Sequence, residues 1–456
     1  MKMVRMQKRE YNRQLGACVR FAKFRRQREK EEGRGMERGE TLIRESAKKC
    51  IGRVYILGRW LLLAGACGIV LGVIAGLFGR CITIVTGFRR THDWMLYLLP
   101  IAGLIIVALY RLDPYKSDTN RVLEGIQSGK YVPLRMSPLI IASTILTHAV
   151  GGSAGREGAA LQLGGSLGGT IGKWLKLDEY DQKVMIMCGM SAAFSALFGT
   201  PLTAAIFAME VISIGIMEYA ALVPCAVAAL IAQQMAEMVG AYGEHFEITQ
   251  AIPFDLKNGA LVIVLALLCA GVSILFCEIL HRTERFFKAK IKNVWIRAAV
   301  GGVLIIALTK VLQTTDYLGT GMDIIEKAVE GETVPLAFLL KMVFTAITLA
   351  CGFKGGEIVP TLFVGATFGC LFGQVTNLEP SLSAACGMAA VFCGVTNTPI
   401  SSLMLSFELF GFEYMPFFLL AVSVSYLESG YFGLYHSQKI MYSKTKLQFI
   451  NKKAKK

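Results

Sequence analysis

The chain has 456 residues, of which 54% are hydrophobic and 18% charged, and its net charge is +15. Soluble domains carry charges at about a quarter of their positions, so this composition excludes an ordinary soluble protein. Apolar runs recur, and several approach the length of about 20 residues with which a helix crosses hydrocarbon. They are 55–78, 96–112, 258–276, 297–312, 336–351 and 416–427. We therefore expect an all-α polytopic membrane protein.

Residues 1–54 form a basic amino-terminal arm. Its first 53 residues contain 17 lysines and arginines against 7 acidic residues. The tail at 446–456 is also basic. Because basic flanks stay in the cytoplasm, we expect both termini there, an even number of crossings, and an arm held on anionic lipid. Nucleic-acid binding is the alternative use of such an arm, and we expect none beside a membrane domain.

Three polar breaks interrupt the apolar pattern, and each precedes a helical run. They are SDTN at 117–120, GGSAGREG at 151–158 and GFKGGEIVP at 352–360. The first turn of a helix has unpaired N–H groups and a partial positive charge, and glycine allows close approach of the backbone. Several helix starts directed at one point would bind an anion. The breaks therefore predict a central anion site inside the membrane.

Glu157 is the residue of these breaks with the clearest functional meaning. A carboxylate at membrane depth is costly and is functional by default. An ionised Glu157 at a helix start would occupy the anion site, and a protonated one could move aside and admit the anion. We therefore expect Glu157 to gate the path and to couple protons to the anion. An ion pair with Arg156 that merely stabilises the break is the structural alternative.

An internal repeat divides the membrane part into two homologous halves. CGMSAAFSALFGTPLTAAIFAME at 188–210 aligns with CGMAAVFCGVTNTPISSLMLSFE at 386–408, an offset of 198. Upstream, GRE at 155–157 aligns with GGE at 355–357, an offset of 200. Many transporters are built from such halves, with the substrate at their interface.

The repeat sets the expected domain boundaries. We expect the first membrane repeat over 55–245 and the second over 255–445, followed by the cytoplasmic tail. Runs such as 138–150 and 399–410 are too short to span. They predict re-entrant half-helices that meet at the central anion site.

Other chemistries have weaker signals. The twelve cysteines lack metal-ligand spacing and lie mostly in apolar runs, which is typical of small core residues; we expect no metal and no cofactor. GGSAGREG lacks the Lys-Ser/Thr of a nucleotide loop. His148 and Ser153 lie near Glu157, but a histidine in an apolar segment is more often a core residue, and we expect no enzyme. A cation or large-solute transporter would need a different or roomier site.

Three segments resemble signature regions of the CLC family of chloride channels and anion/proton exchangers. They are GREGAALQLG, FGTPLTAAIFAMEV and GFKGGEIVPTLFVGATFG, and the similarity extends from about residue 55 to residue 445. The resemblance implies a homodimer with one pore in each subunit, inverted halves and an anion path lined by helix amino termini. The implied partners are a halide anion, protons and membrane lipid.

The resemblance assigns roles to single residues. Glu157 matches the external gating glutamate, and Tyr435 matches the inner-gate tyrosine whose hydroxyl faces the anion. Ile358 and Val359 match residues whose backbone amides bind the central anion. We add the neighbours of Glu157 to the anion-binding segment, namely Gly155, Arg156 and Gly158.

This chain departs most from the family pattern at the central serine segment, where SDTNRVLEG replaces Gly-Ser-Gly-Ile-Pro. Alignment on the following Glu-Gly puts Asp118 at the serine position, where it would face an anion. A shift of one residue brings Thr119 there instead, with Asp118 capping the helix. We therefore take Thr119 and Asn120 as candidate anion ligands.

Two further departures concern the transported anion and the proton. Val211 stands where the exchangers have an internal proton glutamate; its absence is found in channels and in the fluoride-exporting branch. SAGREG and GFKGGE look most similar to that branch, and Ile358 replaces a common phenylalanine. We expect proton-coupled fluoride export across a bacterial-type plasma membrane. A chloride channel or a chloride/proton antiporter of the same fold is the alternative.

Overall fold

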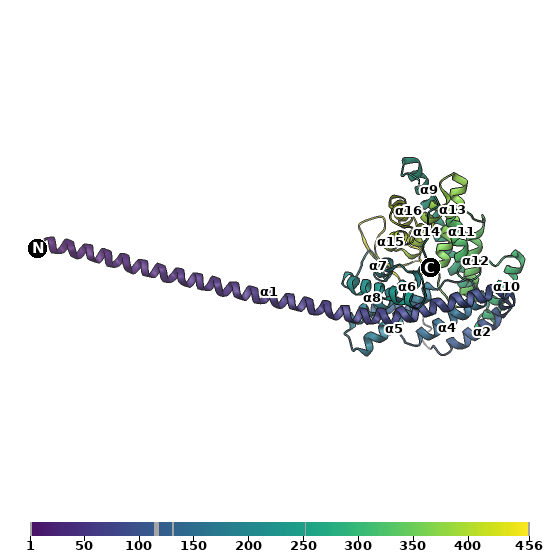
Figure 1. Ribbon diagram of the computed structural model, residues 1–456, viewed down its shortest axis with the longest axis horizontal. Coiled ribbons are helices and arrows are strands. Elements are labelled where there is room, and N and C mark those ends of the chain that lie inside the picture. The colour runs from purple at the N-terminus through teal and green to yellow at the C-terminus, as the bar shows by residue number, and fades with distance from the viewer. Residues whose placement is uncertain (1, 114–117, 130–131, 251, 455–456) are drawn as a thin grey trace. The chain divides into compact units, whose positions relative to one another are not determined.

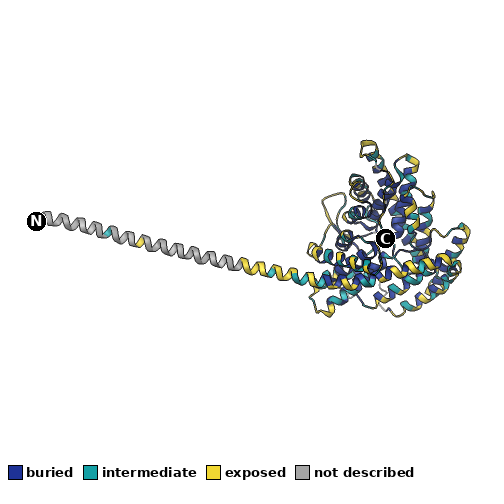
Figure 2. Cartoon of the chain, viewed as in Figure 1, coloured by how far each residue is buried: buried dark blue, intermediate teal, exposed yellow. Residues whose placement is uncertain are grey.

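The structure is a computed structural model that describes residues 2–113, 118–129, 132–250 and 252–454; within 2–45 it describes the side chains of residues 16 and 23 alone. The chain divides into two compact units, residues 1–62 and 63–456. Helix α1, Lys2–Thr91, runs through the predicted boundary at residue 54. Residues 46–62 are largely exposed, whereas the second unit has buried residues throughout its helices (Figure 2).

The second unit consists mainly of helices (Figure 1). Those of the first half are η1 Asp93–Leu98, α2 Leu99–Tyr110, α3 Thr119–Ser128, α4 Met136–Ala149, α5 Glu157–Trp174, α6 Glu179–Phe198, α7 Pro201–Glu210, η2 Tyr219–Ala221 and α8 Leu222–Met238. Those of the second half are α9 Leu256–Lys290, α10 Val294–Leu312, α11 Met322–Val329, α12 Ala337–Ala350, α13 Ile358–Thr376, α14 Pro380–Thr396, α15 Pro399–Phe410 and α16 Met415–Glu428.

Six helical segments of the described chain are long and apolar enough to cross a membrane. They are Ser46–Thr91, Asp93–Tyr110, Tyr219–Met238, Leu256–Lys290, Val294–Leu312 and Ile358–Thr376. Other apolar helices are shorter, among them α4 and α15, which coincide with the short runs at 138–150 and 399–410. The predicted mixture of spanning helices and half-helices is confirmed.

Glycine contacts join two equivalent helix pairs, α5 on α6 and α13 on α14. A Cβ on Gly164 would lie 2.1 Å from the carbonyl oxygen of Gly189, and a Cβ on Gly365 would lie 2.5 Å from that of Gly387. Only glycine leaves room for such backbone contact. The helices that follow the two glycine-rich breaks are thus packed in the same way in both halves.

These contacts correct the alignment of the breaks. Gly189 and Gly387 are 198 residues apart, but their partners Gly164 and Gly365 are 201 apart. The helix starts, Glu157 in α5 and Ile358 in α13, also differ by 201. The predicted offset of 200 is therefore wrong by one residue, because the helix contacts fix the register. The structural counterpart of Glu157 is Ile358 rather than Glu357.

A small sheet was not predicted from the sequence. Its order is β1-β2-β3, formed by β1 Ser213–Ile214, β2 Lys439–Tyr442 and β3 Phe449–Lys453. β1 pairs with β2 in parallel and β2 pairs with β3 antiparallel. The sheet joins the chain after α7 to the carboxyl-terminal tail. It therefore holds the segment that contains Tyr435 against the first half.

The cysteines that were predicted as small core residues are buried. They are Cys67, Cys188, Cys269, Cys277, Cys351 and Cys386.

Candidate functional site

The two glycine-rich breaks of the different halves pair with each other. The N–H of Gly155 donates to the carbonyl oxygen of Gly356 at 2.7 Å, and the N–H of Gly356 donates to that of Gly155 at 2.7 Å. This is an antiparallel bridge, as expected where inverted repeats meet. α5 begins at Glu157 and α13 at Ile358. The bridge therefore brings the starts of α5 and α13 together.

The bridge requires glycine on both sides. A Cβ on Gly356 would lie 2.4 Å from the backbone nitrogen of Gly158, and a Cβ on Gly158 would lie 2.7 Å from the Cα of Gly356. The N–H of Gly155 already has an acceptor in the other half. Of the predicted anion-binding glycines, Gly155 and Gly158 thus form the contact between the halves.

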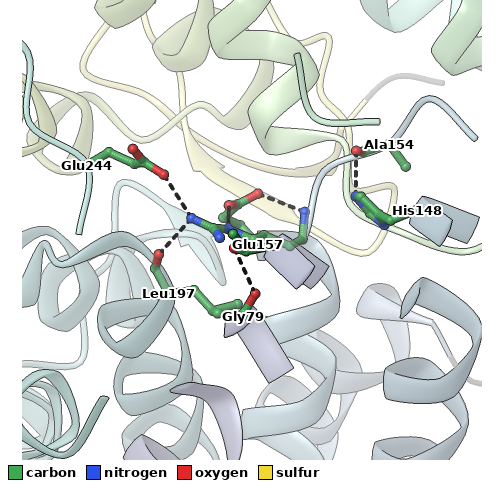
Figure 3. Close-up of polar contacts among 8 residues, drawn as sticks. Gly79, His148, Ala154, Glu157, Leu197 and Glu244 are labelled. Atoms are coloured by element: carbon green, nitrogen blue, oxygen red, sulfur yellow. Dashed lines mark hydrogen bonds and ion pairs between the residues drawn. The ribbon is translucent and has the colours of Figure 1, made fainter. Parts of the chain in front are cut away.

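Glu157 is 1% exposed and its carboxylate turns back toward the start of α5 (Figure 3). Oε2 accepts the backbone N–H of Arg156 at 3.0 Å, and Oε1 accepts from Nε of Arg156 at 3.2 Å. A carboxylate at this position is stabilised by the helix dipole. In this conformation the carboxylate of Glu157 occupies the start of α5, where the sequence predicts an anion site.

The guanidinium of Arg156 is shared between several acceptors (Figure 3). Besides Glu157, it donates to Oε1 of Glu244 at 3.0 Å and to the carbonyl oxygen of Leu197 at 3.3 Å. Arg156 therefore fixes the break to the end of α6 and to the segment after α8. Its side chain directly contacts the gating candidate.

A polar cavity of about 280 Å³ lies next to this contact between the halves. Thr119, Asn120 and Tyr435 of the predicted anion ligands line it, together with Gln162, Lys354 and Glu357. The other predicted residues, Gly155, Arg156, Glu157, Gly158, Ile358 and Val359, are not among its lining residues. The candidate site therefore has two parts, the cavity and the buried helix starts.

The start of α3 forms one wall of the cavity. Asp118 caps α3, because its Oδ1 accepts the N–H of Arg121 at 3.0 Å, as expected. Thr119 is 6% exposed, and its Oγ1 accepts a hydrogen bond from Nε2 of Gln162 at 3.1 Å. Ser117 lies outside the described residues. Asp118 and Thr119 both line the cavity, and the cap formed by Asp118 agrees with the alignment that places Thr119 at the serine position.

Asn120 links α3 to the segment after Tyr435. Its Oδ1 accepts the N–H of Ser437 at 3.0 Å, and its Nδ2 donates to Oδ2 of Asp118 at 3.3 Å. Both the oxygen and the nitrogen of the Asn120 amide thus have hydrogen-bond partners within the protein. This makes Asn120 a structural link at the wall of the cavity.

The hydroxyl of Tyr435 lies at the cavity without a partner. Tyr435 is 2% exposed, and its hydroxyl has no hydrogen-bond partner among the described residues. Buried hydroxyls normally have a partner. A donor of this kind in a polar cavity can bind an anion that enters it.

Comparison with known proteins identifies the family. Residues 102–430 match the family described as voltage gated chloride channel. The chain belongs to this family. A chloride/fluoride channel protein of Pseudomonas syringae pv. tomato is 36% identical over 397 residues, which are 85% of this chain and 88% of that protein. A voltage-gated ClC-type chloride channel of Escherichia coli is 24% identical over 365 residues, which are 75% of this chain and 86% of that protein.

Solved structures share the fold of this CLC protein. A CLC-type fluoride/proton antiporter superposes with a TM-score of 0.81 at 31% identity, covering 85% of this chain and 99% of the other. A slow cyanobacterial Cl⁻/H⁺ antiporter superposes with a TM-score of 0.71 at 18% identity, covering 81% and 94%, and supports the fold alone. The predicted CLC resemblance and the fold of two inverted halves are confirmed.

Two polar residues in the membrane helices of this CLC protein were missed by sequence reasoning. Gln162 lies inside the apolar part of α5, and a polar side chain in such a segment indicates a functional position. Lys341 in α12 is 0% exposed; its Nζ donates to the carbonyl oxygens of Gly319 at 2.8 Å and Tyr317 at 3.3 Å. Lys341 lies inside the apolar run at 336–351, so its charge could have been recognised in the sequence as a functional position in the same way.

His148, Ser153 and Glu157, which lie near one another in the sequence, form no hydrogen-bonded Ser/His/Glu group among the described contacts. The ring nitrogens of His148 lie 2.8 Å from the carbonyl oxygen of Thr144 and 3.0 Å from that of Ala154 (Figure 3). The hydroxyl of Ser153 lies 3.0 Å from that of Thr345. Within the described part of the chain, no group of three or more His, Cys, Asp or Glu could hold a metal. His148 and Ser153 are satisfied core residues of a transport fold.

Proposed function

We propose that the protein is a proton-coupled anion transporter that exports fluoride. The observation that carries this proposal is the buried carboxylate of Glu157 at the start of α5, beside the start of α13. The relatives support it, because one is named a chloride/fluoride channel protein and another a CLC-type fluoride/proton antiporter. Neither a metal nor a cofactor has a role in this proposal.

Glu157 acts as gate and proton carrier in this mechanism. Ionised, it holds the start of α5 through the N–H and Nε of Arg156. Protonation removes its negative charge and weakens both hydrogen bonds. The neutral side chain then leaves, and an anion takes the position that the carboxylate held. Return of the ionised carboxylate expels the anion, so that proton and anion move in opposite directions.

Backbone N–H groups and hydroxyls are the proposed anion ligands. Ile358 and Val359 form the first turn of α13, where N–H groups have no partner within the helix. The hydroxyls of Thr119 and Tyr435 line the adjoining cavity. Fluoride is small and strongly hydrated, so it needs more hydrogen bonds than chloride does. A site built from several neutral donors supports the proposal of fluoride as substrate.

One observation favours the alternative of a passive chloride channel. Val211 is 0% exposed and places an aliphatic side chain where exchangers have an internal proton glutamate. Protons would then have no second carrier at that position. An imposed pH gradient distinguishes the two functions, because it drives anions uphill through an exchanger and not through a channel.

The remaining assignments are proposals that follow from the family and the charge pattern. We propose a homodimer in a bacterial-type plasma membrane, with both termini in the cytoplasm and the arm at 1–54 on anionic lipid. The membrane repeats are proposed over 55–245 and 255–445, and the tail over 446–456. The basic charge of the arm and tail supports this orientation.

Anion efflux from liposomes tests the proposed substrate. Purified protein is reconstituted in vesicles loaded with fluoride or chloride, and an ion-selective electrode follows each anion. Fluoride efflux at least tenfold faster than chloride efflux supports a fluoride exporter. Equal or chloride-favouring efflux without a pH change would identify a chloride channel instead.

A further inference from the structure

A second cavity, of about 420 Å³, lies at the carboxyl-terminal end of α1. It shares no lining residue with the cavity that contains Tyr435. Its charged lining residues are Arg89, Asp93 and Lys310, and Thr314 and Leu318 also line it. These residues come from the end of α1, from η1, from the last turn of α10 and from the segment after α10.

Arg89 is a buried cation with an unsatisfied nitrogen. It is 8% exposed, and its Nε has no hydrogen-bond partner among the described residues. Its neighbour Arg90 instead pairs with Oδ2 of Asp323 at 2.6 Å on the exposed side. A buried guanidinium nitrogen that lacks an acceptor is costly. Arg89 therefore points to an anionic ligand in this cavity.

The other polar groups fit a monoanion. Nζ of Lys310 lies 5.4 Å from the ring centre of Tyr97. Oγ1 of Thr314 accepts the N–H of Asp316 at 3.2 Å, so its own proton is available to a ligand. Arg89 and Lys310 contribute two positive charges and Asp93 one negative charge. The net charge of +1 matches a phosphodiester, which carries one negative charge.

The surroundings favour a lipid over a free ion. Exposed aromatic side chains of η1 next to the cavity, Trp94 at 55% and Tyr97 at 54%, are typical of the level of lipid headgroups. α2 packs on α10, and both helices expose apolar side chains. These are Ile101, Ile105, Val303 and Val311. Acyl chains can lie along these side chains while the phosphate enters the cavity.

We propose that this cavity binds the phosphate of an anionic phospholipid, with Arg89 and Lys310 as its ligands. The site lies against the break that carries Glu157. A Cβ on Gly151 would lie 3.4 Å from Cδ of Arg89, and the N–H of Gly319, next to Leu318, donates to the carbonyl oxygen of Gly152 at 3.2 Å. A bound lipid thus stabilises the position of this break.

Lipid binding to the purified, delipidated full chain tests the proposal without reference to transport. Native mass spectrometry measures the occupancy by phosphatidylglycerol and by phosphatidylcholine, whose choline group would meet two cations. We expect phosphatidylglycerol to bind at least fivefold more tightly. Arg89→Gln should weaken that binding about tenfold, as expected for loss of a charge-assisted contact. Arg90→Gln is the matched control and should leave it unchanged.

Further measurements distinguish lipid binding from misfolding of the variant and from binding of a free anion. If Arg89→Gln fails to fold, Lys310→Gln, at the end of α10, must show the loss of phosphatidylglycerol binding. Inorganic phosphate at millimolar concentration should not displace the lipid. Displacement of the lipid by phosphate at this concentration would assign the cavity to a free anion and overturn the lipid proposal. Equal binding of both lipids, or equal binding by the Arg89→Gln and Arg90→Gln proteins, would also overturn it.

Discussion

Glu210 and Glu408 each cap the helix that carries the other. Glu210, the last residue of α7, accepts the N–H groups of Ile400 at 3.0 Å and Ser401 at 2.8 Å at the start of α15. Glu408 of α15 accepts the N–H groups of Leu202 at 2.8 Å and Thr203 at 2.7 Å at the start of α7. The exchange is reciprocal, as a two-fold relation between inverted halves requires.

This exchange separates two kinds of helix start in the protein. The starts of α7 and α15 have a carboxylate of the opposite half as their acceptor. At the start of α5, the carboxylate of Glu157 accepts instead from the N–H and Nε of its neighbour Arg156. We propose that the transported anion binds at the starts of α5 and α13, which are not capped in this way.

The reciprocal caps predict losses of stability in both halves. Glu210→Gln and Glu408→Gln each weaken two charge-assisted hydrogen bonds from backbone N–H groups, so each should reduce the free energy of unfolding by about 2–3 kcal/mol. Glu210 also accepts from the hydroxyl of Ser401 at 2.5 Å, so its loss should be the larger of the two. Thermal unfolding in detergent should show decreases for both proteins. Glu413→Gln, at an exposed position, is the control. A clear loss in one variant and none in the other would contradict the symmetric arrangement.

The glycine bridge predicts a sharp intolerance of side chains. Gly356→Ala places a Cβ about where the backbone of Gly158 lies, so the starts of α5 and α13 must separate. We expect fluoride efflux to fall at least tenfold and stability to fall by about 1–3 kcal/mol. Gly271→Ala in α9 has nothing within 4 Å of the added Cβ and should behave as wild type. Normal efflux from the Gly356→Ala protein would show that the bridge is dispensable.

Gln162 should determine the direction of the Thr119 hydroxyl. Because Oγ1 of Thr119 accepts from Nε2 of Gln162, its proton is available for an anion in the cavity. Gln162→Glu replaces this donor with an acceptor, so the hydroxyl proton turns to the carboxylate. We expect about tenfold slower fluoride efflux for Gln162→Glu and a smaller effect for Gln162→Met.

Vesicle efflux measures both variants of Gln162 against Thr170→Val. Thr170 is also in α5, but its hydroxyl donates to the carbonyl oxygen of Ser166 at 2.8 Å, outside the cavity. The control should keep wild-type efflux. If Gln162→Glu and Gln162→Met transport fluoride equally well, the hydroxyl of Thr119 is not a ligand that Gln162 directs.

Lys444 predicts a dependence of stability on pH. Burial lowers the pKa of Lys444 to about 8, although its Nζ donates to Oδ1 of Asn397 at 2.6 Å and to the carbonyl oxygen of Tyr426 at 2.9 Å. The unfolded chain binds more protons than the folded chain between this pKa and the ordinary value near 10.5. Stability should therefore rise with pH across that window, by about 3 kcal/mol.

Comparison with Lys444→Gln isolates this effect. Thermal unfolding of both proteins in detergent at pH 7.5 to 10.5, a range that spans the two pKa values, gives the difference between them. Wild type should gain stability relative to the variant as the pH rises. A constant difference across this range would mean that Lys444 does not titrate in the folded protein.

The helix starts of the site could be predicted from the sequence because their signals are local. Glycine, polar residues and the change to apolar pattern mark the starts of α5 and α13, and Asp118 was placed correctly as the cap of α3. The one-residue error in relating Glu157 to the second half arose because GRE and GGE permit two alignments. Only the contact of Gly164 with Gly189, and its counterpart in α13 and α14, selects one.

The rest of the site depends on contacts between distant segments. Ser213 pairs with Lys439 in a parallel ladder. Strand β1 has two residues, which is too short for a local sequence pattern to predict it. The position of Tyr435 follows from this sheet, and its role in the sequence analysis came from family resemblance alone. The pairing of Gln162 with Thr119 likewise needs α3 and α5 to be placed together, although a polar residue in an apolar helix marked Gln162.

Proton movement through the Glu157→Gln protein tests the central claim most directly. Vesicles loaded with fluoride are diluted into fluoride-free buffer, while an electrode follows fluoride and a second electrode follows external pH. Wild type and Glu413→Gln should release fluoride with proton uptake, whereas Glu157→Gln should move protons no faster than empty vesicles. If Glu157→Gln still drives protons against the fluoride gradient at the wild-type rate, Glu157 is not the residue that couples them.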